Sequence, residues 1–334
     1  MFGWRRSKPK QAVSPQAAVA DAATAHDPER LLRQLEWTVL RRLDGILQGD
    51  YRTLFRGFGL DFADLREYQL HDDVRHMDWN VTARMQTPYV REFQEDREVA
   101  AWFVLDLSRS LDFGSQRFRK RDVSASLVAV LARLFIRYGN RVGAVLLSDG
   151  AGEVVPARSG RRHVLHVLDR MRKIGASKTK SIAVTDLSSL IASASPTIRR
   201  RSVVFVVSDF ISTPGWGRRL ADLARRHEVV AIRLYDPLEI EMPNLGMVVL
   251  QDAETGEQLM VDTHDAGFRR RFAKGAEKRE AELRSALASA GVDCLELSTE
   301  EPIDTALLRF TRMRKRRSQL AGGGVPAAVL GQSL

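Results

Sequence analysis

One carboxylate and two hydroxyls follow a single apolar segment of the chain at alternate positions. The apolar run over 99–105 leads to Asp106, and Ser108 and Ser110 come directly after it at every second residue. In an extended segment alternate side chains point to the same side, so these oxygen groups are expected to converge. Such ligands suit Mg²⁺, which prefers octahedral oxygen coordination. The spacing therefore predicts a divalent-cation site where the segment ends.

Two further segments can supply oxygen ligands to the same place. Thr185 directly precedes a predicted helix, with Thr179 in the same loop as the alternative, and Asp209 ends the apolar strand VVFVVSD. Ligands of open parallel sheets gather outside the carboxyl ends of the strands. Aspartate and serine are also ordinary turn and helix-cap residues, so the motif around Asp106 is weak alone. The joint placement at three strand-to-helix junctions is what favours a metal.

From residue 99 onward, segments of strand and helix character alternate. Strands separated by helices of this length imply right-handed crossovers and a mainly parallel sheet covered on both faces, so we predict a doubly wound α/β domain. A hairpin turning near Thr255-Gly256 is predicted over 246–262. The predicted strands are 99–107, 141–148, 201–210, 228–235 and 292–298, and the predicted helices are 119–140, 161–175, 185–195, 215–227, 266–291 and 301–317.

The first part of the chain has a different character. A helix is predicted from Pro28, with Asp27 as its cap and an apolar face that reaches Ile46. The segment 51–98 mixes aromatic, glycine and charged residues without a helical stripe, which predicts short strands and turns. The predicted division is a disordered tail over 1–27, the helix with a small β-rich subdomain over 28–98, the α/β domain over 99–317, and a flexible tail over 318–334.

Composition narrows the class of protein. The 334 residues are 44% hydrophobic and 28% charged, which is typical of a globular protein, and no apolar run is long enough to span a membrane. The single cysteine, Cys294, excludes an intramolecular disulfide and fits a cytoplasmic location. The net charge of +10 comes partly from basic runs at 199–201, 269–271 and 312–317. These lack interleaved aromatic residues, so they are interpreted as solvated faces and nucleic-acid binding is disfavoured.

The predicted cation site resembles the metal-ion-dependent adhesion site of the von Willebrand factor A fold. In that family Asp-x-Ser-x-Ser, a threonine from a second loop and an aspartate after a later strand surround the ion. The resemblance implies a metal held by Asp106, Ser108, Ser110, Thr185 and Asp209. It also implies that one coordination position is left for a partner's carboxylate, so that the ion acts as an adhesive and not as a catalyst.

The preceding segment resembles the bacterial family called domain of unknown function 58. The family pattern is Leu-Arg-x-Tyr, then Gly-Asp-Asp-x-Arg-x-Ile-Asp-Trp, then Thr-Ala-Arg, and this chain departs from it at His71 and Met77. The matching residues are Leu65, Arg66, Tyr68, Asp72, Asp73, Arg75, Asp78, Trp79, Thr82, Ala83 and Arg84. The resemblance implies action with a MoxR-type AAA+ ATPase in chaperone-like maturation or activation of client proteins, whose acidic residue would bind through the metal. Many members carry membrane spans, so this chain is expected to be a soluble variant.

The matching charged residues are expected to form a paired network that holds short strands together, with Tyr68 and Trp79 supplying apolar area. The alternative is that this segment forms a binding surface for the ATPase or its client. The sequence favours the structural role, because exposed binding surfaces seldom combine so many opposite charges with aromatic residues that are usually buried.

An enzymatic role has little support in the sequence. No Walker A motif, dinucleotide fingerprint, nucleophile elbow or His-Glu-x-x-His motif is present. His163 and His166 are spaced to share a helix face, but no third ligand is placed beside them. We therefore predict a non-catalytic, Mg²⁺-dependent protein-interaction module. A metal-dependent phosphoester hydrolase is the alternative, and a nucleic-acid-binding protein is a third and weaker one.

Overall fold

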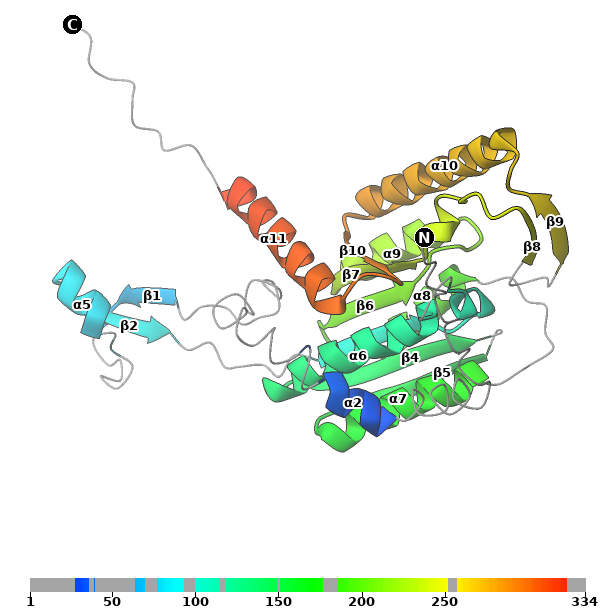
Figure 1. Ribbon diagram of the computed structural model, residues 1–334. Coiled ribbons are helices and arrows are strands. Elements are labelled where there is room, and N and C mark those ends of the chain that lie inside the picture. The colour runs from blue at the N-terminus through cyan, green and yellow to red at the C-terminus, as the bar shows by residue number, and fades with distance from the viewer. Residues whose placement is uncertain are drawn as a thin grey trace, which may run out of the picture.

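A six-stranded sheet forms the centre of the protein in a computed structural model, which describes residues 28–35, 39, 64–69, 77, 79–92, 100–114, 118–148, 151–176, 186–251 and 257–322 (Figure 1). The strand order is β10-β7-β6-β3-β4-β5, and all neighbours are parallel except β4 and β5. This confirms the predicted doubly wound, mainly parallel α/β fold. The strands are β3 (Ala100–Asp106), β4 (Arg141–Ser148), β5 (Ala151–Arg158), β6 (Val203–Ser208), β7 (Glu228–Tyr235) and β10 (Asp293–Ser298).

Helices cover both faces of the sheet, and each face has its own apolar core. One core contains side chains of α2 (Pro28–Leu35), α6 (Lys120–Arg137), α7 (Arg161–Ala176) and α11 (Ile303–Gly322). The other contains side chains of α8 (Leu187–Thr197), α9 (Trp216–Ala224) and α10 (Ala266–Ala290). Because both faces are buried, the central strands are continuous apolar runs, which is why they were predictable.

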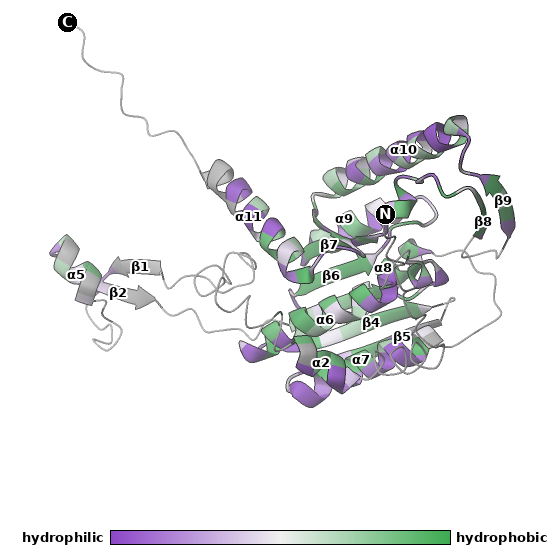
Figure 2. Cartoon of the chain, in the orientation of Figure 1, coloured by the Kyte–Doolittle hydropathy of each residue, from purple (hydrophilic) through white to green (hydrophobic). Residues whose placement is uncertain are grey.

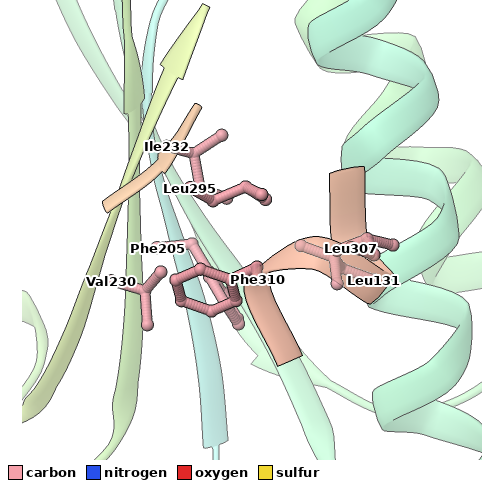
Figure 3. A pocket seen from close by; sticks show the side chains of 7 residues that line it. All are labelled: Leu131, Phe205, Val230, Ile232, Leu295, Leu307 and Phe310. Carbon is pink, nitrogen blue, oxygen red and sulfur yellow. The ribbon is translucent and has the colours of Figure 1, made fainter. Parts of the chain in front are cut away.

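A small hollow remains in the first core between the sheet, α6 and α11 (Figure 3). All seven residues that line it are apolar, among them Phe205 and Phe310. Phe205 also stacks on Phe103 with ring centroids 5.2 Å apart. A hollow without polar groups offers nothing to orient a ligand, so it belongs to the packing of the core and not to a functional site.

Strand β5 was not predicted from the sequence. It contains Gly152 and Pro156, two residues that weaken a strand assignment. Its position explains why they are tolerated: β5 lies at the edge of the sheet and pairs antiparallel with β4 alone. A proline in an edge strand does not remove a hydrogen bond from the interior of the sheet.

The segment that carries the family pattern contains a helix where only strands and turns were predicted. β1 (Asp64–Glu67) and β2 (Tyr89–Glu92) pair antiparallel, and α5 (Trp79–Met85) lies between them in the chain. This helix is too short to show an apolar stripe, and Thr82 fixes it to β2 by accepting a 3.0 Å hydrogen bond from the Tyr89 amide. Trp79 is 67% exposed, so the expectation that it adds buried apolar area was wrong.

The predicted charge network of this segment stays a prediction. Arg66 lies in β1 and Arg84 in α5, while the half-buried Tyr68 follows β1 and its amide donates to the Pro88 carbonyl. The remaining charged residues of the pattern lie outside the described residues, namely Asp72, Asp73, Arg75 and Asp78.

The predicted terminal helices and the predicted hairpin are both present among the described residues. The N-terminal helix is described over Pro28–Leu35, and α11 continues to Gly322, into the segment predicted as a flexible tail from 318. Residues 1–27 and 323–334 lie outside the described residues. β8 (Met247–Gln251) and β9 (Gln258–Asp262) pair antiparallel, which confirms the hairpin. None of the described helices has the length and apolar character needed to cross a bilayer.

We expect Gly143→Ala to destabilise the sheet, because a Cβ atom at this position in β4 would lie 2.7 Å from the ring of Trp102 on the paired strand β3. Relieving the overlap requires a shift of a buried ring, at a cost of about 1–3 kcal/mol in the free energy of unfolding. Urea denaturation measures it. Gly152→Ala is the matched control, since its Cβ would meet no atom closer than 3.7 Å. Equal stability of the two variants would contradict the close approach of Trp102.

Candidate metal centre

The ends of strands β3 and β6 bring Asp106 and Ser208 together. The two strands are parallel with Leu105 beside Val207, so the next residues of each strand are neighbours. Asp106 is buried, and its Oδ2 accepts a 2.7 Å hydrogen bond from the Ser208 hydroxyl. Its Oδ1 accepts a 2.9 Å bond from the Ser108 amide. Asp106 is therefore held in one orientation from two directions.

The two predicted serine ligands lie against each other beside this carboxylate. The hydroxyls of Ser108 and Ser110 are 2.9 Å apart, and both residues are buried. The prediction assumed an extended segment, but a 3₁₀ helix, η3 (Arg109–Asp112), begins directly after Ser108. The turn, and not strand alternation, thus brings Ser110 back towards Ser108. Three of the five predicted ligands are gathered at one point.

Asp209, the fourth predicted ligand, is buried and engaged by a lysine. Its Oδ2 accepts a 2.7 Å bond from Lys120 Nζ, and its Oδ1 accepts from the Ile211 amide at 3.0 Å. The same ammonium donates to Glu239 Oε1 at 2.7 Å. Glu239 ends the short helix η4 (Pro237–Glu239) after β7, and its Oε2 accepts from the Asp236 amide. Lys120, at the start of α6, has no exposed surface.

The carboxylates of Asp106 and Asp209 have different electrostatic surroundings. Burial, together with the nearby charge of Asp209, raises the pKa of Asp106 to about 6. Burial alone would lower the pKa of Lys120, but the charges of Asp209 and Glu239 outweigh it and raise that pKa. Lys120 therefore stays protonated, and Asp106 is the carboxylate that lacks a cationic partner among the described groups around it.

Thr185, the fifth predicted ligand, lies outside the described residues, as does the alternative Thr179. The next residue, Asp186, is the cap of α8 and accepts a 3.0 Å bond from the Ser188 amide. The Leu187 amide donates to the Ser212 hydroxyl at 2.9 Å, which fixes the start of α8 to the loop that follows Asp209. The role of Thr185 as a ligand stays a prediction.

Three site residues were missed by the sequence analysis: Ser208, Lys120 and Glu239. Ser208 had a signal, because aligning the apolar runs of β3 and β6 places it, and not Asp209, beside Asp106. Lys120 lies in the basic run RFRKR, where nothing distinguishes a buried lysine from its solvated neighbours. Glu239 is separated from Lys120 by 119 residues and reaches it only through the tertiary fold.

The donor set fits a hard divalent cation. Two hydroxyls and a carboxylate converge, and Lys120 offsets one of the three buried or half-buried carboxylate charges around the site. The excess negative charge is what a divalent ion would neutralise. In the described part of the chain, His, Cys, Asp and Glu nowhere gather in groups of three or more as metal ligands. A cation here would consequently depend on the serine hydroxyls and on water or partner oxygens.

The two histidines of α7 and the cysteine of β10 lie in surroundings that do not favour metal binding or nucleophilic chemistry. His163 Nε2 lies 2.8 Å from the Val142 carbonyl, and no third ligand joins His163 and His166 within the described residues. Burial raises the pKa of the Cys294 thiol to about 12, so the thiolate needed for nucleophilic chemistry is suppressed.

The chain matches the model of a known protein family. The model of the family "Protein of unknown function DUF58" matches residues 64–282. Uncharacterised proteins of Mycobacterium bovis and Mycobacterium tuberculosis are each 40% identical over 292 residues, covering 87% of this chain and 90% of theirs.

Solved structures with partial similarity include an aerotolerance-related membrane protein from Bacteroides fragilis, with 13% identity and a TM-score of 0.42 over 65% of this chain and 99% of that one. BatB from Bacteroides thetaiotaomicron has 14% identity and a TM-score of 0.38 over 66% of this chain and 99% of that one. The SpRpn10 VWA domain has 11% identity and a TM-score of 0.37 over 63% of this chain and 93% of that one.

We expect Lys120→Met to destabilise the fold by about 3–5 kcal/mol, because it leaves the Asp209 and Glu239 carboxylates without their shared cation. Urea denaturation measures the loss. The matched control is Lys173→Met, since Lys173 is 55% exposed and pairs with Asp169 on the surface of α7, where an ion pair contributes at most about 1 kcal/mol. A Lys120 variant as stable as the control would show that the buried ion pairs do not hold these loops.

Proposed function

The chain belongs to the DUF58 family of proteins of unknown function, and we propose that it is a non-catalytic, Mg²⁺-dependent protein-interaction module. One observation carries the proposal: Asp106, Ser108 and Ser110 converge at the carboxyl edge of the sheet, while the second carboxylate, Asp209, is committed to Lys120. Oxygen donors at the carboxyl edge of a doubly wound sheet lie where such folds bind their ligands.

The different partners of the Asp106 and Asp209 carboxylates favour an ion that binds a protein partner over an ion that catalyses a reaction. Both oxygens of Asp209 already accept hydrogen bonds, from Lys120 and from the Ile211 amide. Asp106 is then the single anionic group free of a cationic partner among the described site residues, and the serine hydroxyls are neutral. A Mg²⁺ bound through Asp106 and the serine hydroxyls would have a single anionic ligand among the described site residues and an open position for an external carboxylate. The site would thus select an acidic residue of a protein partner.

The proposed partners follow from the family resemblance. We propose that the module acts with a MoxR-type AAA+ ATPase and presents client proteins to it for maturation or activation. The proposal places the protein in the cytoplasm, with which the half-buried free thiol of Cys294 is compatible. The proposal includes a contact between the ATPase and the segment with the family pattern, for which the exposed ring of Trp79 is available.

No observation in the described residues favours the alternative functions. The Ser108 hydroxyl lies 2.9 Å from that of Ser110 and beside the Asp106 carboxylate, among oxygen groups that a cation could bind. The basic runs are partly engaged within the protein: Arg314 pairs with Glu228 and Asp293, and Arg271 lies 3.5 Å from Asp265. Charges consumed in this way contribute less to binding phosphates.

We expect Asp106→Ala to abolish Mg²⁺ binding measured by calorimetry and Mg²⁺-dependent capture of the purified MoxR-type ATPase or its client. The substitution removes the carboxylate that a cation would bind directly, and EDTA should reproduce the loss with the unsubstituted protein. Asp222→Ala is the matched control, because Asp222 is a half-exposed carboxylate on α9 whose nearest basic partner, Arg225, is 3.9 Å away.

Two results would count against this proposal. Unchanged Mg²⁺ binding by the Asp106 variant would remove the cation from this site. Loss of Mg²⁺ binding with undiminished capture would show that partner binding does not pass through the ion.

A further inference from the structure

The hairpin of β8 and β9 carries an exposed apolar face. Val249 lies opposite Met260, and Met247 is two residues before Val249, so the three side chains share one face. They are 54%, 65% and 62% exposed, respectively. On the other face Val261 is buried and Val248 half-buried, while Leu259 is 63% exposed, so that face packs against the protein in part. The apolar colouring of both strands is visible in Figure 2.

The hairpin also has unpaired edges. Among the described elements, β8 and β9 form a sheet of two strands, and neither outer edge is paired with a third strand. Isolated two-stranded sheets are marginally stable, and an edge strand with apolar side chains is a template for another strand. Figure 1 shows the hairpin projecting beyond the helices and the central sheet. An added strand would complete its hydrogen bonding and cover its apolar face.

The hairpin lies at the same edge of the sheet as the candidate metal centre. β7 is parallel to β6, so the connection that leaves its carboxyl end starts beside Asp209. Glu239, in that connection, is fixed to the site by Lys120. At the base of the hairpin, Thr263 donates to the Gly246 carbonyl at 2.7 Å and accepts from the Leu245 amide at 2.8 Å. These bonds close the base of the hairpin.

The surroundings of the hairpin are basic. The first turns of α10, which follow β9, contain Arg269, Arg270 and Arg271, and Asp265 lies 3.5 Å from Arg271. Arg269 donates to the His264 carbonyl at 3.1 Å, which keeps its guanidinium at the base of the hairpin. A partner that lies on the hairpin would meet apolar side chains flanked by positive charge.

We propose that the edge of this hairpin receives an extended segment of a protein partner in which apolar side chains alternate with acidic ones. The inference rests on the proposed function, because it describes the partner whose carboxylate the metal centre would bind. Strand addition uses main-chain hydrogen bonds for affinity and alternate side chains for specificity. A second copy of this chain fits less well, since pairing two hairpins would bring two basic helix starts together. A lipid surface also fits less well, because no described residue of β8 or β9 is aromatic.

The test uses a short fluorescent peptide of alternating leucine and aspartate, with the full-length protein and Mg²⁺, read by fluorescence anisotropy. The double variant Val249→Ser/Met260→Ser should weaken binding at least about tenfold, the loss expected when two apolar anchors are removed. The control Val154→Ser replaces an apolar residue that is 44% exposed on the edge strand β5, and it should bind as the unsubstituted protein does. A peptide with lysine for aspartate should bind at least about tenfold more weakly.

Mg²⁺ binding measured in parallel separates this inference from the proposed function. The hairpin variant should retain Mg²⁺ binding, because its substitutions are exposed and outside the metal centre. Peptide binding that persists in Asp106→Ala but is lost in the hairpin variant would support the hairpin site and count against adhesion through the ion.

The inference is overturned by any of three results. The first is equal peptide binding by the hairpin variant and the unsubstituted protein. The second is a concentration-dependent dimer that the hairpin substitutions dissociate, seen by sedimentation. The third is binding to anionic phospholipid vesicles, lost in the hairpin variant, without binding of the peptide.

Discussion

The buried ammonium of Lys120 is the interaction on which the carboxyl edge of the sheet depends. Asp209 and Glu239 come from the loops after two neighbouring strands, and both carboxylates lie within 2.7 Å of the same nitrogen atom. A charge taken out of water without a partner costs several kcal/mol, roughly a large fraction of the stability of a whole domain. The ammonium therefore determines that α6, the loop after β6 and η4 meet in a single arrangement.

The absence of such a partner at Asp106 has a thermodynamic consequence. Its carboxyl group is stabilised by an amide and a hydroxyl, and burial beside Asp209 raises its pKa to about 6. Because the folded-state pKa is above the unfolded value of 3.8, the stability that protonated Asp106 contributes is complete below that value and is lost as the pH rises through about 6. At neutral pH the fold carries an ionised, buried carboxylate. A bound cation would offset that cost, so cation binding and folding are expected to reinforce each other.

Local patterns made much of the fold and part of the candidate site predictable. The buried strands are apolar throughout, and the spacing of Asp106, Ser108 and Ser110 is contained within a few residues. The partners of Asp209 were not predictable, because a lysine in a basic run becomes buried only when Glu239, distant in the chain, meets it. Helix α5 lacks a stripe because it has only seven residues. Strand β5 was not predicted because it contains Pro156, a residue that an edge strand tolerates.

A strained turn directly follows Ser208 and Asp209, the two strand-end residues of the candidate metal centre. Phe210 has a φ of 59°, which a bulky residue adopts only when its surroundings compensate for the strain. Its ring packs on Trp216 with centroids 5.1 Å apart, and its amide donates to the Ser208 hydroxyl at 2.9 Å. The hydroxyl is then oriented to donate to Asp106, while the next residue, Asp209, is directed to Lys120. Adjacent residues of one strand end thus serve the half around Asp106, which has no cationic partner among the described groups, and the ion-paired half around Lys120. The apolar contact of Phe210 with Trp216 stabilises the turn that follows both residues.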